Sequence, residues 1–233
     1  MKYEPHQFRF ALDIIESNHD LKTLWKEVTD VIEGISDEDI ANEFNSPPLY
    51  MPNQFNKDGT PKKRPTAKMS LSAALNNLLS DGFLEKKWIP ESDVFPGSSR
   101  ANESWRLDFS KSANRPAGEI TGFAVEVAFN HGEAIAWNLL KPTLAGEINH
   151  VKTETEIGAG IGIYICAKKK LKTAGAFDNA SGEYEKVLRY LNPLFQRLTI
   201  PLVIIGLEAP ETIKLEKVKD PITKKHKSKV VPI

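Results

Sequence analysis

The stretch GFAVEVAFNHGEAIAWNLLKP, residues 122–142, decides the fold because its pattern predicts a strand, a turn and a helix in direct succession. Side chains alternate between the two faces of a strand, so Phe123 and Val125 share one bulky, apolar face that must pack on the core. Glu126 lies on the other face, among small residues. A buried carboxylate without a partner is unfavourable, or its pKa shifts. The small neighbours therefore predict open space over this acid, kept for a purpose.

The composition is ordinary for a globular chain of 233 residues, with 40% hydrophobic and 27% charged residues. The formal net charge is +0, so binding to nucleic acid would need a local basic surface. The single cysteine, Cys166, excludes a disulfide framework and a thiolate zinc site, and its apolar surroundings predict a core residue. The N-terminal residues lack an apolar signal segment and no run reaches the length of a membrane span, so we expect a cytoplasmic protein.

The order of elements predicts the fold class. Helical periodicity dominates the first third of the chain, and apolar strands then alternate with helices. The expected strands are residues 103–110, 122–129, 160–168 and 201–209, and the expected helices are residues 8–17, 21–35, 70–88, 133–150 and 183–198. We therefore expect an α/β (α+β) protein with a mixed central sheet flanked by helices. Its last two strands should be buried on both faces, because they are nearly continuous apolar runs.

We expect one domain over residues 1–233, with a mostly helical part up to residue 69, a core over residues 70–210 and a lysine-rich tail over residues 211–233. Residues 45–68 are rich in Pro, Asn and Lys and are expected to form a loop. The basic residues of this loop form either a solvated surface or an arm that contacts phosphates. The tail is either a flexible end or an extra edge strand.

A second acid, Asp108, lies in the preceding expected strand, residues 103–110. Trp105, Leu107 and Phe109 are expected on one face of this strand. Asp108 belongs to the other face, so a long hairpin would let it meet Glu126. Two adjacent carboxylates repel unless a cation lies between them, and a few oxygen ligands suit Mg²⁺. The alternative is an ordinary sheet face on which the acids are solvated or pair with the nearby cations, which are Arg106 and Lys111.

The order of these motifs resembles the PD-(D/E)XK nuclease core, and more closely the BglII/BstYI-type restriction endonucleases. The resemblance rests on LDFSKS, VEVAFNH, an apolar helix, GIYICA, a helix beginning at SGEYE, and TIPLVIIGL. The upstream segment LNNLLSDGFLEKKWIPE also resembles that family's helix and Trp-containing connection. The likeness covers roughly residues 70–210, and the order and spacing of the motifs make it specific.

The resemblance implies a homodimeric, Mg²⁺-dependent enzyme that cuts double-stranded DNA at a short palindromic site. By position, Asp108 matches the family's first metal-binding acid and Glu126 matches the second. Glu91, three residues after Trp88, matches a place where related enzymes hold another polar active-site residue.

One position departs from the family pattern. The family has Gln, Glu or Lys two residues after the second acid, and this chain has Ala128. Another residue can take over, and the candidates are Glu119 and Asn130, with Lys111 and Lys141 further off. Alternatively, the site is impaired and the protein binds DNA without cutting it.

The resemblance also implies a set of residues that reach base edges in the major groove. These are Asn130, His131, Lys141, Asp178, Asn179 and Ser181. Asn130 and His131 could instead form only a turn, and Asn179 or Ser181 could cap the helix that starts near Glu183.

Three functions are therefore open at this point. The first is a type II restriction endonuclease, and the second is a DNA-binding protein of the same fold without catalysis. The third is an interaction protein whose sheet face binds another protein.

Overall fold

A computed structural model of the chain describes residues 1–46, 50–55, 61–63, 69–94, 105–113, 122–129, 131–148, 159–219 and 226–233. The helices are α1 (Ala11–Ser17), α2 (His19–Glu33), α3 (Asp37–Asn45), α4 (Ser72–Glu85), the short 3₁₀ helix η1 (Gly132–Ala134), α5 (Ile135–Ile148), α6 (Lys169–Ala174) and α7 (Tyr184–Leu191). The strands are β1 (Tyr3–Phe8), β2 (Tyr50–Phe55), β3 (Pro61–Lys63), β4 (Ile89–Asp93), β5 (Arg106–Ser112), β6 (Gly122–Ala128), β7 (Ala159–Ala167), β8 (Leu202–Leu207), β9 (Ile213–Lys219) and β10 (His226–Pro232).

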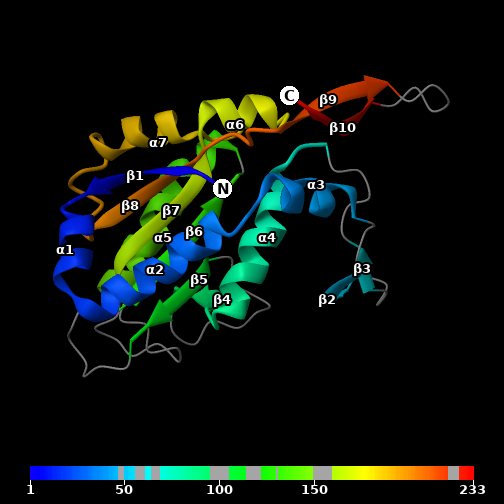
Figure 1. The fold of residues 1–233 in the computed structure, drawn as a ribbon. Helices are drawn as coiled ribbons and strands as arrows, with labels where there is room; N and C mark the ends of the chain where they lie inside the picture. The colour runs from blue at the N-terminus through cyan, green and yellow to red at the C-terminus, as the bar shows by residue number, and fades with distance from the viewer. Residues whose placement is uncertain are drawn as a thin grey trace.

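Six of these strands form a mixed sheet in the order β1-β8-β7-β6-β5-β4 within the described part of the chain (Figure 1). Strands β6, β7 and β8 are parallel, whereas β4, β5 and β1 each run antiparallel to their neighbours. The expected mixed α/β class is therefore confirmed. The two strands with nearly continuous apolar runs, β7 and β8, are both interior strands of the sheet, as expected for strands covered on both faces.

Helices cover both faces of the sheet, and apolar cores lie on both sides of it. Phe123 and Val125 of β6 pack with apolar side chains of α2 and α4 on one face. On the other face, α5 and α7 pack on β7 and β8, and the predicted core residue Cys166 is buried there. Figure 1 shows α2 and α4 in front of the sheet and α5 behind it. None of the described helices has the length and apolar character needed to cross a membrane.

Several described segments differ from the sequence-based expectation, and they include helices α3 and α6, which were not predicted. Strand β1 was not expected, and the helix predicted to start at Phe8 starts at Ala11. The expected loop over residues 45–68 contains the strand pair β2–β3, and β4 adds an unexpected edge strand to the sheet. In the described part of the tail, β9 and β10 form a separate two-stranded sheet, so neither is an edge strand of the main sheet.

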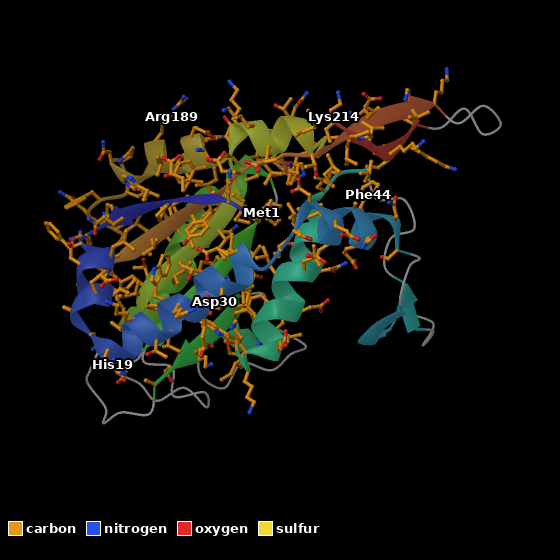
Figure 2. The ribbon with its side chains drawn as sticks, in the orientation of Figure 1. Met1, His19, Asp30, Phe44, Arg189 and Lys214 are labelled. Carbon is orange, nitrogen blue, oxygen red and sulfur yellow. The ribbon has the colours of Figure 1, made fainter. Side chains whose placement is uncertain are left out.

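Strands β1, β4, β9 and β10 were missed because most of their side chains are polar and exposed, so apolar alternation is weak. Strand β1 is held by pairing with β8 and by Lys168, whose amine binds Glu4 on β1 and lies 2.6 Å from Glu208. Surface side chains line the outer elements, as Figure 2 shows for Arg189 on α7 and Lys214 on β9. Backbone pairing and ion pairs, rather than a hydrophobic pattern, place such strands.

Helix α5 continues through Pro142, which lies inside the helix. The helix packs so closely on β7 that Gly162 has no room for a side chain. A Cβ at Gly162 would lie 2.7 Å from Cβ of Pro142 and 2.4 Å from Cδ2 of Leu202. This glycine therefore sets how near α5 comes to the sheet.

We expect Gly162→Ala to lower the free energy of unfolding by about 1–3 kcal/mol, because the added methyl group overpacks this contact. Urea unfolding followed by circular dichroism measures the change. Gly182→Ala is the control, since a Cβ there lies 3.3 Å from the flexible side chain of Ile135 and should cost less. Equal stabilities of Gly162→Ala and the unaltered protein would contradict the close packing of α5.

Candidate active site

The small residues beside Glu126 do not leave open space, so that expectation is wrong. Helix α5 covers this face of β6. Ala128 packs with Ile135 and Leu139 of the helix, and Ala124 packs with Ala145. Glu126 itself is only 1% exposed. The small side chains of β6 therefore let a helix approach closely, and the carboxylate is enclosed between the strand and the helix.

Glu126 has a cationic partner on this helix. The Lys141 Nζ donates a hydrogen bond to Glu126 Oε2 over 2.8 Å. The glutamate side chain is 2% exposed and the lysine side chain is 20% exposed, so the pair connects the buried face to the surface. Two further polar side chains lie nearby, because Tyr164 pairs with Glu126 in the β6–β7 register and hydrogen-bonds to Asn138 of α5.

Asp108 lies where β5 separates from β6. The two strands are paired from Phe109 and Val125 onward, and beyond that point the Val127 backbone N–H donates to Asp108 Oδ2 over 2.6 Å. The expected alternation on β5 is interrupted here. Phe109 packs in the core under α2 and α4, whereas Leu107 packs on the α5 side of the sheet. The carboxylate thus takes the place of a strand-to-strand hydrogen bond and is held by the backbone beside Glu126.

Glu91 is a third acid near Asp108 and Glu126. The pairs Pro90–Phe109 and Ser92–Leu107 flank it, so it lies opposite Asp108 across β4 and β5. Its φ of 51° is in the left-handed region, which is uncommon for a residue with a side chain. Glu91 is exposed. Strands β4, β5 and β6 thus each contribute one carboxylate to one part of the sheet.

The electrostatics show that these groups interact. Burial raises the pKa of Glu126 to about 8, the Asp108 charge raises it as well, and Lys141 acts to lower it. Burial also raises the pKa of Asp108, and the negative charge of Glu91 adds to that rise, against the Val127 hydrogen bond and Lys141. Two mutually repelling, poorly solvated carboxylates favour a bound cation.

The ordinary alternative for the two acids is wrong. Arg106 Nε lies 3.1 Å from Asp93, and Lys111 Nζ lies 2.6 Å from Glu27. Neither cation pairs with Asp108 or Glu126 among the described contacts, and Glu126 is not solvated. Lys111 also donates to the Lys86 carbonyl, away from the acids, so it does not replace the missing polar group at residue 128.

A divalent cation fits the donors present, although no ready-made cluster is seen. Among the described residues, no three His, Cys, Asp or Glu side chains come together as a metal site. Two carboxylates completed by water are nevertheless a usual set for Mg²⁺. Glu126 Oε1 is buried and has no hydrogen-bond partner in the described part of the chain. This unpartnered oxygen and the adjacent Asp108 are the groups that would hold the ion.

The two expected recognition loops meet in space. An antiparallel bridge joins His131 to Ser181, and the Gly132 N–H donates to the Ala180 carbonyl over 2.7 Å. Helix α7 begins after Glu183 and has no side-chain cap, so the expectation that Asn179 or Ser181 caps it is wrong. His131, Asp178 and Asn179 are exposed, whereas Ser181 is 8% exposed.

One supporting residue of these loops was missed. The Lys172 Nζ donates to the Asn179 carbonyl over 2.9 Å and to the Ser181 carbonyl over 2.8 Å. Nothing in the sequence distinguishes Lys172 from any other lysine on a short helix. Asn138 and Tyr164 were also missed. Asn138 precedes Lys141 by three residues, a helical spacing that could have indicated it, whereas only the pairing of β6 with β7 brings Tyr164 beside Glu126. Glu119 and Asn130 lie outside the described residues.

With the geometry described, the comparison with known proteins identifies the family. The sequence profile of the restriction endonuclease BglII/BglIII family matches residues 3–207. The chain belongs to this family. It is therefore a restriction endonuclease that acts on DNA at specific sites, and enzymes of this family use a divalent metal ion.

Two solved structures are similar to this chain. The structure described as restriction endonuclease BglII complexed with a DNA 16-mer matches with a TM-score of 0.57 and 16% identity, and the match covers 100% of both chains. The structure of free BglII matches with a TM-score of 0.47 and 18% identity, covering 100% of this chain and 94% of the other. No curated protein sequence matches. The first structural match supports the restriction-endonuclease fold, a PD-(D/E)XK fold, on which the acids Asp108 and Glu126 lie on neighbouring strands.

The raised pKa of Glu126 gives this restriction endonuclease a pH-dependent stability when no metal is present. The folded protein holds this proton up to about pH 8, whereas the unfolded chain loses it near 4.5. The folded state binds the extra proton between these values. Its stability should therefore fall as the pH rises from about 5 to about 8, by at most about 1.4 kcal/mol per pH unit.

Glu126→Gln removes this ionisation, so its stability in EDTA should depend less on pH over that window. Urea unfolding at several pH values measures the two slopes. Glu27→Gln, which removes the acid of the other lysine pair, serves as the control and should keep the original slope. Parallel profiles for Glu126→Gln and the unaltered protein would show that Glu126 does not titrate as described.

Proposed function

We propose that the chain is a Mg²⁺-dependent type II restriction endonuclease that hydrolyses both strands of a short palindromic DNA site and leaves 5′-phosphates. The observation that supports this most is the pair formed by buried Glu126 and partly buried Asp108, held by Lys141 and by the Val127 amide in a fold of this nuclease family. Family membership supplies the class of reaction. The acid pair indicates where in this chain the reaction would take place.

Each acid has a proposed role. Asp108 and Glu126 hold the metal ion, and Glu91 and Glu119 assist. When bound, Mg²⁺ polarises the scissile phosphodiester and lowers the pKa of the attacking water. Asp108 is suited to its role because the backbone of β6 fixes its carboxylate. Glu91 is suited to assist because it faces Asp108 and is open to solvent.

The proposed reaction is an in-line displacement at phosphorus. The oxygen of a water molecule forms a bond to phosphorus, and the bond from phosphorus to O3′ breaks with its electron pair on O3′. The water loses one proton to solvent and O3′ takes up one. The products are a 5′-phosphate and a 3′-hydroxyl. The enclosed acids act by orientation and charge rather than by forming a covalent intermediate.

DNA is the substrate, and the two bridged loops are proposed to read its bases. Asn130, His131, Asp178, Asn179 and Ser181 are assigned to this contact. The support is that the His131–Ser181 bridge makes one surface from two distant segments. Exposed Asp178 and Asn179 lie beside this bridge, and Lys172 holds the loop backbone. Lys141 was also expected to read bases, but its amine contacts Glu126 here.

A palindromic site calls for two identical active sites, so we propose a C₂ homodimer in which each subunit cuts one strand. Residues 1–233 are proposed to act as one domain, and the protein is proposed to work in the cytoplasm. The second candidate function is sequence-specific DNA binding without cleavage. Ala128 motivates it, because a buried methyl group stands where the family resemblance expects a polar side chain.

The first test is incubation of the purified protein with unmethylated phage DNA, in Mg²⁺ and in EDTA. Discrete fragments in Mg²⁺ alone are expected, and their ends give the site and the cut position. Absence of fragments in both Mg²⁺ and Mn²⁺, across DNAs of different composition, would favour the binding-only function.

Asp108→Asn should reduce the cleavage rate by about 100- to 1000-fold, because it removes one negative charge from the proposed metal site. The amide oxygen can still accept from the Val127 N–H, so the fold should be retained. Gel assays in Mg²⁺ measure the rate. Asp30→Asn on α2 is the matched control and should cleave normally, since Asp30 pairs with Lys26 at the surface (Figure 2). Normal cleavage by Asp108→Asn would place the active site elsewhere.

Asn179→Ala should weaken binding to the mapped site by about 1–3 kcal/mol and leave binding to unrelated DNA unchanged, because a base contact carries sequence information and a phosphate contact does not. Fluorescence anisotropy in EDTA at a fixed salt concentration measures both affinities. Asn192→Ala, at the exposed end of α7, is the control. An equal loss on both DNAs would assign Asn179 to the phosphate backbone.

A further inference from the structure

The packing of α5 explains why no polar side chain stands at residue 128. Ala128 is 2% exposed and lies in an apolar cluster with Ile135, Leu139 and Cys166. A longer polar side chain would have to enter this cluster, which would separate the helix from β6 or leave a buried group without a partner. Position 128 is therefore closed by the helix that covers it.

The same helix brings a cation to the acid. Lys141 follows Asn138 by three residues and precedes Ala145 by four, and both of these contact the sheet side. Lys141 therefore lies at the edge of the helix face that covers β6. Its amine reaches Glu126 at this edge, at 2.8 Å.

The amine has capacity for a second partner. A lysine ammonium has three donors, and Glu126 is its one acceptor among the described residues. The lysine side chain is 20% exposed while the glutamate is 2% exposed, so an incoming molecule reaches the amine before the carboxylate. A phosphate oxygen or a water molecule can accept the remaining donors.

We propose that Lys141 is a catalytic residue of this nuclease, supplying from α5 the polar group that is missing at Ala128. The inference rests on the proposed function. The amine donates to the scissile phosphate or to the attacking water and stabilises the negative charge that develops during displacement. It adds no bond-making step, because water still forms the new bond to phosphorus and O3′ still leaves. This role is distinct from the base contact expected from sequence.

A purely structural role makes different predictions. If Lys141 only keeps the Glu126 carboxylate charged and in place, its removal damages metal binding and cleavage together. If Lys141 acts on the substrate, its removal takes a competing cation away from Glu126. Metal binding is then retained or tightened while cleavage is lost.

Lys141→Met is the test variant, since it keeps the length of the side chain and removes the charge. Lys111→Met is the matched control, because it removes a lysine that is paired with a glutamate at 2.6 Å and similarly exposed at 24%. Mn²⁺ affinity is measured by the loss of the free-ion electron paramagnetic resonance signal, and cleavage is measured in Mg²⁺. Thermal unfolding in EDTA verifies that both variants fold, and Lys141→Arg keeps the charge if Lys141→Met does not fold.

Lys141→Met is expected to cleave about 100- to 1000-fold more slowly, with Mn²⁺ affinity unchanged or higher. Lys141→Arg should cleave faster than Lys141→Met, and Lys111→Met should cleave normally. A parallel loss of Mn²⁺ affinity and cleavage, or full cleavage by Lys141→Met beside an active unaltered protein, would overturn the assignment of Lys141 alone. No cleavage by the unaltered protein would overturn the proposed function and this assignment with it.

Discussion

The carboxyl group of Glu126 has to be accommodated between strand β6 and helix α5, and much of the structure follows from that constraint. Burial favours the neutral form of this acid, so the helix that encloses it must also bring a cation if the carboxyl group is to ionise. Lys141 is that cation. For its amine to reach the acid, α5 must lie close to the sheet, which requires small residues on β6 and β7. Ala124, Ala128 and Gly162 meet this requirement.

The mixed sheet brings the second acid to the first. Strands β6 to β8 run parallel, and the antiparallel β5 adds Asp108 at the side where the pairing with β6 ends. There the carboxylate accepts a hydrogen bond from the Val127 N–H, which would otherwise bond to the backbone of a neighbouring strand. One interruption in the hydrogen-bond ladder therefore both fixes the carboxylate and leaves it next to Glu126. An acid on a regular, fully paired strand would not be held in this way.

In the proposed function, substrate recognition and chemistry are joined through the same part of the chain. Strand β6 carries Glu126 and leads directly to His131, which is bridged to Ser181 after α6. Helix α5 starts at this bridge and carries Lys141 to the acid. Loops are suited to vary with the DNA site, whereas the strand and the helix hold the reacting groups. With the proposed roles, this arrangement links the loops assigned to base contacts to the acids through a short stretch of the chain.

The sequence alone determined the elements with strong apolar patterns and the acids within them. The pattern of β6, β7 and β8 predicted central strands, and Asp108 and Glu126 stood out as carboxylates on neighbouring strands. The polar edge strands β1 and β4 were not predictable, because backbone pairing with a distant strand places them. Small residues around an acid are compatible both with an open cavity and with a close-packed helix. Only the tertiary structure decided between these, since the contact of α5 with β6 involves residues that local periodicity does not connect, and that contact brought Lys141 to Glu126.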